Sequence, residues 1–315
     1  MTAGHGPTLV HRAFVYSGDQ EFLAAALPFV RAGLAADEVV LVAAPPPRLD
    51  LLRPALGADA DPVLFVDVAE WYRHPVHTIA AYDGFLRANA PRRVRALAEL
   101  QWAGRSALEI GEWVRYEAVV NAVFGRWAAN ALCAYDLNAA PPGVVDGVHR
   151  THPEMVVGGR PRASARYTEP IRFSAECDRA PLPPPDGFDS IPIESADLHD
   201  VRSFVAARAA DHGLPPAAVT RMLVAVTELA TNAVEHGAPP MAVRVWSDGG
   251  DLCCEIADRG RWHPAAMLGY APPATAADGG FGLWAARMLA DVVQVRAGWD
   301  GTVVRLRMRL PGRTG

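Results

Sequence analysis

Lysine is missing from this sequence, in which all 30 basic residues are arginine. A P-loop holds phosphate with a lysine, a eukaryotic-type protein kinase needs a strand lysine, and a Schiff-base enzyme needs a lysine amine. These three classes are therefore excluded. The sequence also lacks the G-x-S-x-G pattern that is typical of many serine hydrolases.

Cysteine is scarce, and none of the four cysteines belongs to a C-x-x-C pair. Cys253 and Cys254 are adjacent, so on a strand their side chains would point to opposite faces of the sheet. We therefore expect neither a disulfide framework nor a zinc site.

An excess of basic charge and long apolar runs are lacking too. The net charge of -5 and the isoelectric point near 6.1 argue against direct nucleic-acid binding, because nucleic-acid readers are usually basic. The first twelve residues lack the charged-then-apolar pattern of a signal peptide, and no apolar run reaches about 18 residues. We expect a cytoplasmic protein that does not enter a membrane.

A length of 315 residues predicts about two domains. In the first, residues 1–168, short apolar strands alternate with amphipathic helices, which favours a parallel α/β sheet covered on both faces. The predicted strands are 12–17, 38–43, 63–68, 94–100 and 131–135, and the predicted helices are 20–34, 49–56, 76–89 and 107–130.

Prolines mark the boundary between the domains. Pro181, Pro183, Pro184 and Pro185 cannot continue a helix or a central strand, so residues 169–189 are interpreted as a linker. The second domain, residues 190–315, is predicted to contain strands 190–194, 242–246 and 252–257, helices 196–212, 217–236 and 283–292, and a closing hairpin that turns at Asp300-Gly301.

The last strand alternates strictly between apolar residues and arginines. The apolar positions are Val304, Leu306, Met308 and Leu310, and the arginines are Arg305, Arg307 and Arg309. This alternation predicts one buried and one solvated sheet face, with helices on a single face. The arginines could bind an acidic partner, although a solvated face is the simpler interpretation.

Three segments of the second domain carry residues suited to nucleotide chemistry. Glu228 and Asn232 lie one helical turn apart, where a carboxylate could activate a nucleophile and an amide oxygen could bind Mg²⁺. Asp258 ends a strand before Gly260 and could accept a hydrogen bond from an exocyclic amine. Residues 279–282, Gly-Gly-Phe-Gly, open a helix whose N-terminus favours phosphate.

In this order, the three segments and the one-sided sheet resemble the GHKL ATPase fold, and closely its anti-sigma-factor branch, over residues 190–310. The resemblance implies that Glu228 is the catalytic base, that Asn232 binds Mg²⁺ and that Asp258 contacts adenine. It further implies nucleotide contacts at these positions: Thr231, Asn232, Gly260, Gly280, Gly282 and Thr302. Several relatives carry an arginine at or just before the glycine loop, where this chain has Asp278 and Phe281; Arg259 or Arg261 could replace it.

The first domain is similar to the MEDS sensory domain, a RecA-like α/β module without a P-loop. The segments that carry this resemblance are 11–16, Arg115-Tyr116-Glu117 with Asn121, 133–136 and 150–153. Glu117 and Asn121 could face a ligand pocket, although Trp113, Val120 and Phe124 around them are typical of a core.

Several histidines suggest other functions. His199-Asp200-Val201-Arg202 resembles the phosphoacceptor box of histidine kinases, but the two long helices of a phosphoacceptor bundle do not precede the ATPase domain. His74 with His77, and His149 with His152, have metal-like spacing without an obvious third ligand in sequence. We expect structural or capping roles for these pairs.

The two resemblances together imply an anti-sigma factor that acts in signal transduction and transcription regulation. Such a protein would bind ATP and magnesium, sequester a sigma factor and act as a serine/threonine-protein kinase on a STAS-type anti-anti-sigma protein, and it could form a homodimer. The residues leave two alternatives open: a non-catalytic nucleotide-binding sensor and a histidine-kinase-like signalling ATPase.

Overall fold

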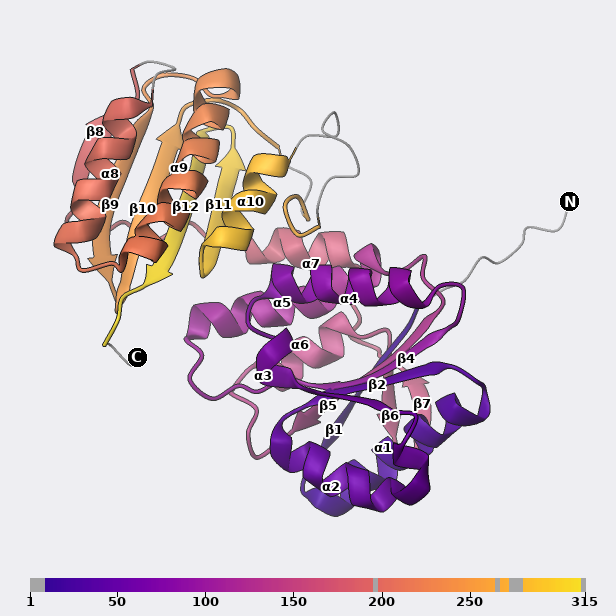
Figure 1. Ribbon diagram of the computed structural model, residues 1–315. Helices are drawn as coiled ribbons and strands as arrows, with labels where there is room; N and C mark the ends of the chain where they lie inside the picture. Colours follow the sequence, from indigo (N-terminus) through magenta and orange to yellow (C-terminus); the bar gives the residue numbers. More distant parts are fainter. Residues whose placement is uncertain (1–8, 195–197, 264–266, 272–279, 313–315) are drawn as a thin grey trace, which may run out of the picture. The chain divides into compact units, whose positions relative to one another are not determined.

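The computed structural model describes residues 9–194, 198–263, 267–271 and 280–312. Its contacts divide the chain into two compact units, Met1–Phe173 and Ser174–Gly315 (Figure 1). Each unit has its own sheet and its own apolar core, and each is described by itself.

A seven-stranded sheet forms the centre of the first unit, in the order β3-β2-β4-β5-β1-β6-β7. Its strands are β1 (Val10–Tyr16), β2 (Val39–Ala44), β3 (Leu64–Asp67), β4 (Val94–Glu99), β5 (Ala129–Asp136), β6 (Glu154–Val157) and β7 (Arg160–Ala163). The neighbouring strands pair in parallel, except that β7 pairs antiparallel with β6. The parallel α/β sheet predicted for this half of the chain is therefore confirmed.

Helices cover both faces of this sheet. They are α1 (Asp19–Ala35), α2 (Pro46–Leu56), α3 (Val68–Trp71), α4 (Pro75–Asn89), α5 (Ala107–Val123) and α6 (Val144–Thr151), with a 3₁₀ turn at Gly57–Ala60 and α7 (Pro170–Cys177) at the end. Helices α1 and α2 lie on one side and α4 and α5 on the other (Figure 1). Phe22 and Val30 of α1 pack with Phe14 and Val42 of the strands in one core.

Several parts of this unit differ from the sequence prediction, including the short helix α3 and helix α7, which begins in the segment interpreted as a linker. Helix α5 ends at Val123 rather than at residue 130, and the chain turns through Gly125 into β5. The α6 helix and the β6–β7 hairpin were not predicted, because each is short: eight residues for the helix and four for each strand.

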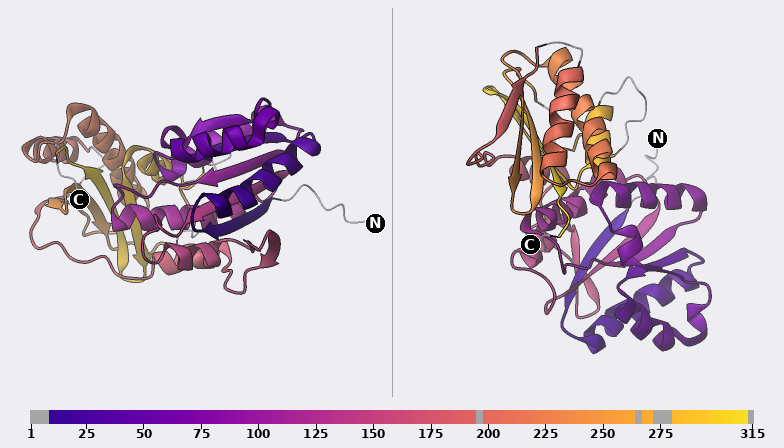
Figure 2. Two further views of the ribbon diagram at one scale, coloured as in Figure 1. Left: turned by 90° about the horizontal axis from the view of Figure 1, so that it is seen from below. Right: turned by 60° about the vertical axis from the view of Figure 1, so that its left-hand side comes forward.

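The second unit is a two-layer sandwich. Its antiparallel sheet has the order β11-β12-β10-β9-β8, and helices lie along one side of it (Figure 2). The strands are β8 (Asp189–Pro192), β9 (Ala242–Asp248), β10 (Asp251–Asp258), β11 (Val292–Gly298) and β12 (Gly301–Arg309), and the helices are α8 (His199–Asp211), α9 (Pro216–His236) and α10 (Phe281–Leu289). The predicted one-sided helix layer is confirmed.

Helix α9 is the central helix of this layer. By length and composition it could cross a membrane. Its apolar stripe nevertheless packs inside the unit, where Met222, Val226 and Leu229 contact the core beside Val293 and Leu306 of the sheet. Such a stripe is typical of the core helix of an α/β sandwich.

The opposite face of this sheet is largely covered, which corrects the prediction of a solvated face made from the arginine alternation, although Arg309 is exposed. Arg305 and Arg307 of β12 are only 3% and 6% exposed. Residues 177–188, here called the strap, cover this face: Arg305 donates to the carbonyl of Pro183 at 3.1 Å, Arg296 donates to that of Ala180, and Arg244 stacks on Phe188.

The buried arginines are neutralised by acidic residues on the same face. Glu255 of β10 accepts from Nε and Nη2 of Arg305 at 3.0 and 2.7 Å and from Arg244 at 3.0 Å, and Arg307 pairs with Asp248 at 2.7 Å. A charge can be buried when its hydrogen bonds and counter-charge are both supplied. The strand period predicted which side chains share a face, but it could not show that the chain itself covers that face.

Candidate functional site

Helices α9 and α10 bring the first predicted pair of side chains to the glycine segment. Glu228 and Asn232 lie one turn apart on α9, and Gly282 is in the first turn of α10. A Cβ atom placed on Gly282 would lie 3.0 Å from Nδ2 of Asn232 and 3.3 Å from Oε2 of Glu228. The glycine thus lets the start of α10 approach the carboxylate and the carboxamide closely.

Asp258, at the end of β10, packs against two glycine backbones. Its Oδ1 accepts a hydrogen bond of 2.6 Å from the amide of Gly260. A Cβ on Gly237, just after α9, would lie 2.7 Å from Cγ of Asp258, and a Cβ on Gly260 would lie 2.7 Å from the Cα of Gly237. Side chains are therefore excluded where the end of α9 meets the end of β10, and backbone surrounds the carboxylate.

Burial raises the pKa of Asp258, while the amides of Gly260 and Ala238 act in the opposite direction. Thr302 is paired directly with Asp258 across the β10–β12 ladder and is buried, and its hydroxyl donates to the carbonyl of Gly260 at 3.5 Å. The structure thus brings Asp258, Gly260 and Thr302 together, and Asp258 and Gly260 lie against Gly237, the residue that follows α9.

Gly280 precedes α10 in a left-handed conformation, with φ of 80°. The first-turn amides of a helix have no partner within the helix, so the start of α10 offers N–H donors and a positive dipole end beside Glu228 and Asn232. Thr231 is half-buried on α9, next to Asn232. Gly279 and Asp278 lie outside the described residues.

The two arginines considered as replacements in the glycine loop contact the β11–β12 turn. The guanidinium of Arg259 donates to the carbonyl of Asp300 at 3.5 Å, and that of Arg261 lies 5.0 Å from the centre of the Trp299 ring. In this conformation neither guanidinium contacts Glu228 or Asn232 through an interaction of the described residues.

A small cavity in the first unit lies where the sequence suggested a pocket. Its volume is about 50 Å³, and its wall is mainly apolar, with Tyr72, Tyr82 and Val120 among the lining residues beside Glu117. Asn121 lies behind this wall and bonds to His11 at 3.0 Å. A cavity of this size holds a few waters or a small molecule.

Sequence reasoning missed a polar cluster at the carboxyl ends of β1, β4 and β5. Glu99 accepts a 2.9 Å hydrogen bond from the hydroxyl of Tyr16, and Arg48 lies 3.7 Å from Glu99 and 2.9 Å from Asp136. Burial raises the pKa of Glu99 to about 7, although the hydrogen bond from Tyr16 and the positive charge of Arg48 both act to lower it. The fold alone unites these residues, which are far apart in sequence.

The raised pKa of Glu99 predicts a loss of stability with increasing pH. The folded state binds this proton more tightly than the unfolded state, so the contribution is complete below pH 4.5 and is lost as the pH rises through about 7. The change in the free energy of unfolding between these pH values is about 3 kcal/mol, and Glu99→Gln should remove this pH dependence. Urea denaturation at several pH values measures the effect; the exposed Asp59→Asn should keep the wild-type pH dependence, and an unchanged slope in Glu99→Gln would contradict the prediction.

The remaining histidine predictions have separate outcomes. His74 caps α4 by accepting from the amide of Val76 at 3.3 Å, as expected for a capping role. His199 is the first residue of α8, whose Val201 and Val205 belong to the core of the second unit itself. His152 is buried next to His11 rather than grouped with His149, and it is the C-cap residue of α6, in keeping with the structural or capping role expected for it.

Comparison with known proteins identifies both units. Residues 10–153 match the family model described as "MEDS: MEthanogen/methylotroph, DcmR Sensory domain", and residues 191–308 match that of the "Histidine kinase-like ATPase domain". No curated protein matches the chain.

Several solved structures are similar to part of the chain. The RsbU and RsbW domains of Rv1364c from Mycobacterium tuberculosis are 22% identical over 40% of this chain and 32% of that one, with a TM-score of 0.30. The blue-light activated histidine kinase EL346 from Erythrobacter litoralis is 21% identical over 36% of this chain and 42% of that one, with a TM-score of 0.26. The chain thus spans less than half the length of either protein.

Proposed function

We propose, for a chain that joins a MEDS sensory domain to a histidine kinase-like ATPase domain, that it is a cytoplasmic anti-sigma factor with serine kinase activity. Its ATPase domain would bind ATP and magnesium, hold a sigma factor and phosphorylate a serine of a STAS-type protein, under control of the MEDS domain. The observation that carries this proposal is the convergence of Glu228 and Asn232 on Gly282 at the start of α10.

Each residue of the site has a distinct part in this proposal. Asp258 accepts the exocyclic amine of adenine, held in place by the amide of Gly260. Asn232 supplies an amide oxygen for Mg²⁺, and the first amides of α10 donate to phosphate oxygens. Glu228 accepts the proton of the substrate serine as its hydroxyl attacks the γ-phosphate and ADP leaves. A magnesium ion held by Asn232 would neutralise phosphate charge.

A second candidate is a non-catalytic sensor whose ATPase domain only binds nucleotide or a partner. The contacts of Arg259 and Arg261 with the β11–β12 turn favour it, because they hold both guanidinium groups at that turn. Transfer of phosphate from ATP to a serine of another protein separates the two candidates, because a non-catalytic sensor would not carry it out. Autophosphorylation on an acid-labile histidine would instead support a histidine-kinase-like activity.

Replacing Asn232 with alanine tests the nucleotide site. We expect Asn232→Ala to weaken binding of ATP with magnesium by about 10- to 100-fold, the range that corresponds to losing one ligand of a charged group. Calorimetry with and without magnesium measures this change, and labelled ATP with candidate STAS proteins measures transfer. Thr220→Ala, at an exposed position near the start of α9, is the control. Unchanged affinity and transfer in Asn232→Ala would show that the site is assigned wrongly.

A further inference from the structure

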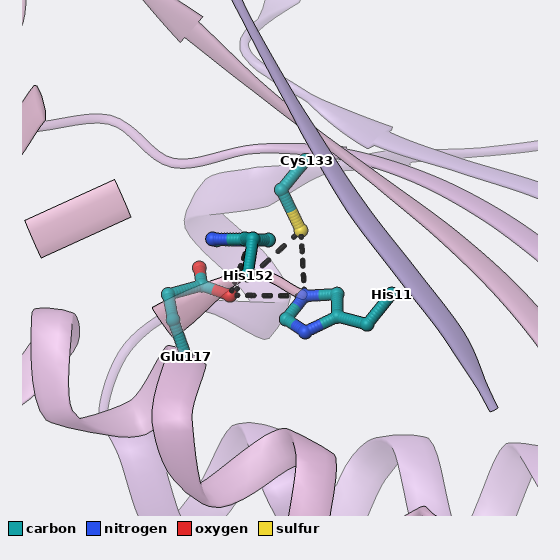
Figure 3. A group of neighbouring side chains, drawn as sticks. All are labelled: His11, Glu117, Cys133 and His152. Atoms are coloured by element: carbon teal, nitrogen blue, oxygen red, sulfur yellow. Dashed lines mark hydrogen bonds and ion pairs between the residues drawn. The ribbon is translucent and has the colours of Figure 1, made fainter. Parts of the chain in front are cut away.

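Four buried side chains of the MEDS domain face one another: His11 of β1, Glu117 of α5, Cys133 of β5 and His152 after α6 (Figure 3). Each offers one donor atom, and all four donor atoms lie within 4.8 Å of one another. Such a group could be a hydrogen-bonded polar cluster or a metal site, and the hydrogen bonds around it distinguish the two.

Both histidine rings are held by acceptors on their outer nitrogen. Nδ1 of His152 lies 3.0 Å from the carbonyl of Val148, which can only accept. Nδ1 of His11 lies 3.0 Å from Oδ1 of Asn121, whose Nδ2 donates to the carbonyls of Glu117 and Thr151. Each Nδ1 therefore carries the proton, and each Nε2 presents a lone pair to the centre of the group.

This tautomer leaves acceptor atoms facing one another. Nε2 of His152 is 3.6 Å from Oε2 of Glu117, and among the described residues it has no hydrogen-bond partner. Protonating both rings would not resolve the conflict, because their centroids are only 4.2 Å apart and two imidazolium charges would repel. A cation between the donors satisfies all of the lone pairs.

Four of the six distances between donor atoms match tetrahedral geometry, and the other two are at most 4.8 Å. Nε2 of His11 lies 3.5 Å from Oε2 of Glu117 and 3.4 Å from Sγ of Cys133, and Sγ lies 3.7 Å from Oε2. Zinc bonds of about 2.0–2.3 Å place tetrahedral ligands roughly 3.3–3.7 Å apart. No large movement of the backbone is needed to close such a site.

Charge and ligand type select the ion. One carboxylate, one thiolate and two neutral imidazoles balance a divalent cation, so the site is neutral although all four residues are buried. Magnesium and calcium prefer oxygen ligands, whereas a mixed nitrogen, sulfur and oxygen set in a tetrahedral arrangement suits zinc.

We propose that His11, Glu117, Cys133 and His152 bind one Zn²⁺ ion inside the MEDS domain. Binding releases the thiol proton of Cys133, and Asn121 and Val148 orient the two rings as outer hydrogen-bond partners. His11, Glu117 and Cys133 also line the 50 Å³ cavity, so the ion forms part of the cavity wall and is accessible to a small molecule that enters it.

The test uses the full chain after removal of metal with a chelator. We expect one Zn²⁺ per chain in competition with a chromophoric chelator, and Co²⁺ in its place should give the near-ultraviolet sulfur-to-metal charge-transfer band of a thiolate ligand. Cys133→Ser should abolish that band, and Glu117→Gln should weaken Zn²⁺ binding by on the order of 100-fold. Cys177→Ser, a cysteine outside the cluster, should behave like the wild type.

The zinc stoichiometry and the cobalt spectrum of the wild-type chain test the proposal even if a variant fails to fold. Substoichiometric Zn²⁺ or a cobalt spectrum without the thiolate band would overturn the proposal. So would a folded Cys133→Ser variant, checked by circular dichroism, that keeps both the band and the zinc affinity. Asn121→Ala should lower the affinity by about 10- to 100-fold while keeping the band, because it removes an outer partner rather than a ligand.

Discussion

Glu228→Gln is expected to lower transfer of phosphate to a serine substrate by about 100- to 10,000-fold, the usual contribution of a positioned general base. Glutamine keeps the shape of the side chain beside Gly282 but cannot take a proton from the serine hydroxyl. Binding of ATP with magnesium should change little, because Asn232, Asp258 and the α10 amides are intact. Single-turnover transfer from labelled ATP, together with calorimetry of ATP binding, separates the two effects.

Glu235→Gln provides the matched control for this experiment. Glu235 lies two turns further along the same helix, and its side chain is 60% exposed. The same chemical change at that position should leave transfer and binding as in the wild type. Equal loss in both variants, or full transfer by Glu228→Gln, would mean that Glu228 is not the base.

Glu255→Gln is expected to destabilise the ATPase domain by about 3 kcal/mol, since it leaves the Arg305 cation buried without its counter-charge. The volume of the side chain is kept, so the effect reports on charge rather than on packing. Thermal unfolding of this domain should shift down by roughly 10 °C. Calorimetry of the full chain measures the shift.

Asp211→Asn removes a carboxylate from an exposed ion pair and is the control for burial. Asp211 pairs with Arg208 at 2.8 Å, and its side chain is 60% exposed. Such pairs contribute about 0–1 kcal/mol, so the unfolding temperature should hardly move. If both variants shift the transition equally, the strap does not shield Glu255 in solution.

Local spacing predicted the parts of the candidate site that lie within one element. Glu228 and Asn232 share a helix turn, and Asp258 ends a strand before a glycine, so each pair could be interpreted without the fold. The approach of Gly282 to α9, and of Gly237 to Asp258, depends on packing between elements that no sequence window contains.

The four-residue cluster shows why the rest could not be predicted. His11 and Cys133 lie on neighbouring parallel strands, where His11 is paired with Ala131, two residues before Cys133. Residues two apart on a strand share a face, but that relation needs the strand pairing to be known. Because His152 was considered together with its sequence neighbour His149, its proximity to His11 and Cys133 of the sheet was not predicted. The prediction that the arginine face is solvated was wrong for the same reason. Periodicity shows which side chains share a face, but it does not show what covers that face.

Occupancy of the β-sheet by the strap limits where a regulatory protein can bind the ATPase domain. A competitor for that face would have to displace the chain's own residues 177–188, which are permanently present at high effective concentration. The arginines of this face already donate to Glu255, Asp248 and the strap carbonyls. Few of their N–H groups therefore remain to bind the carboxylates of an acidic partner. The helical layer, where Val224 of α9 and Phe281 of α10 are 47% and 55% exposed, is a face of this domain that the strap does not cover.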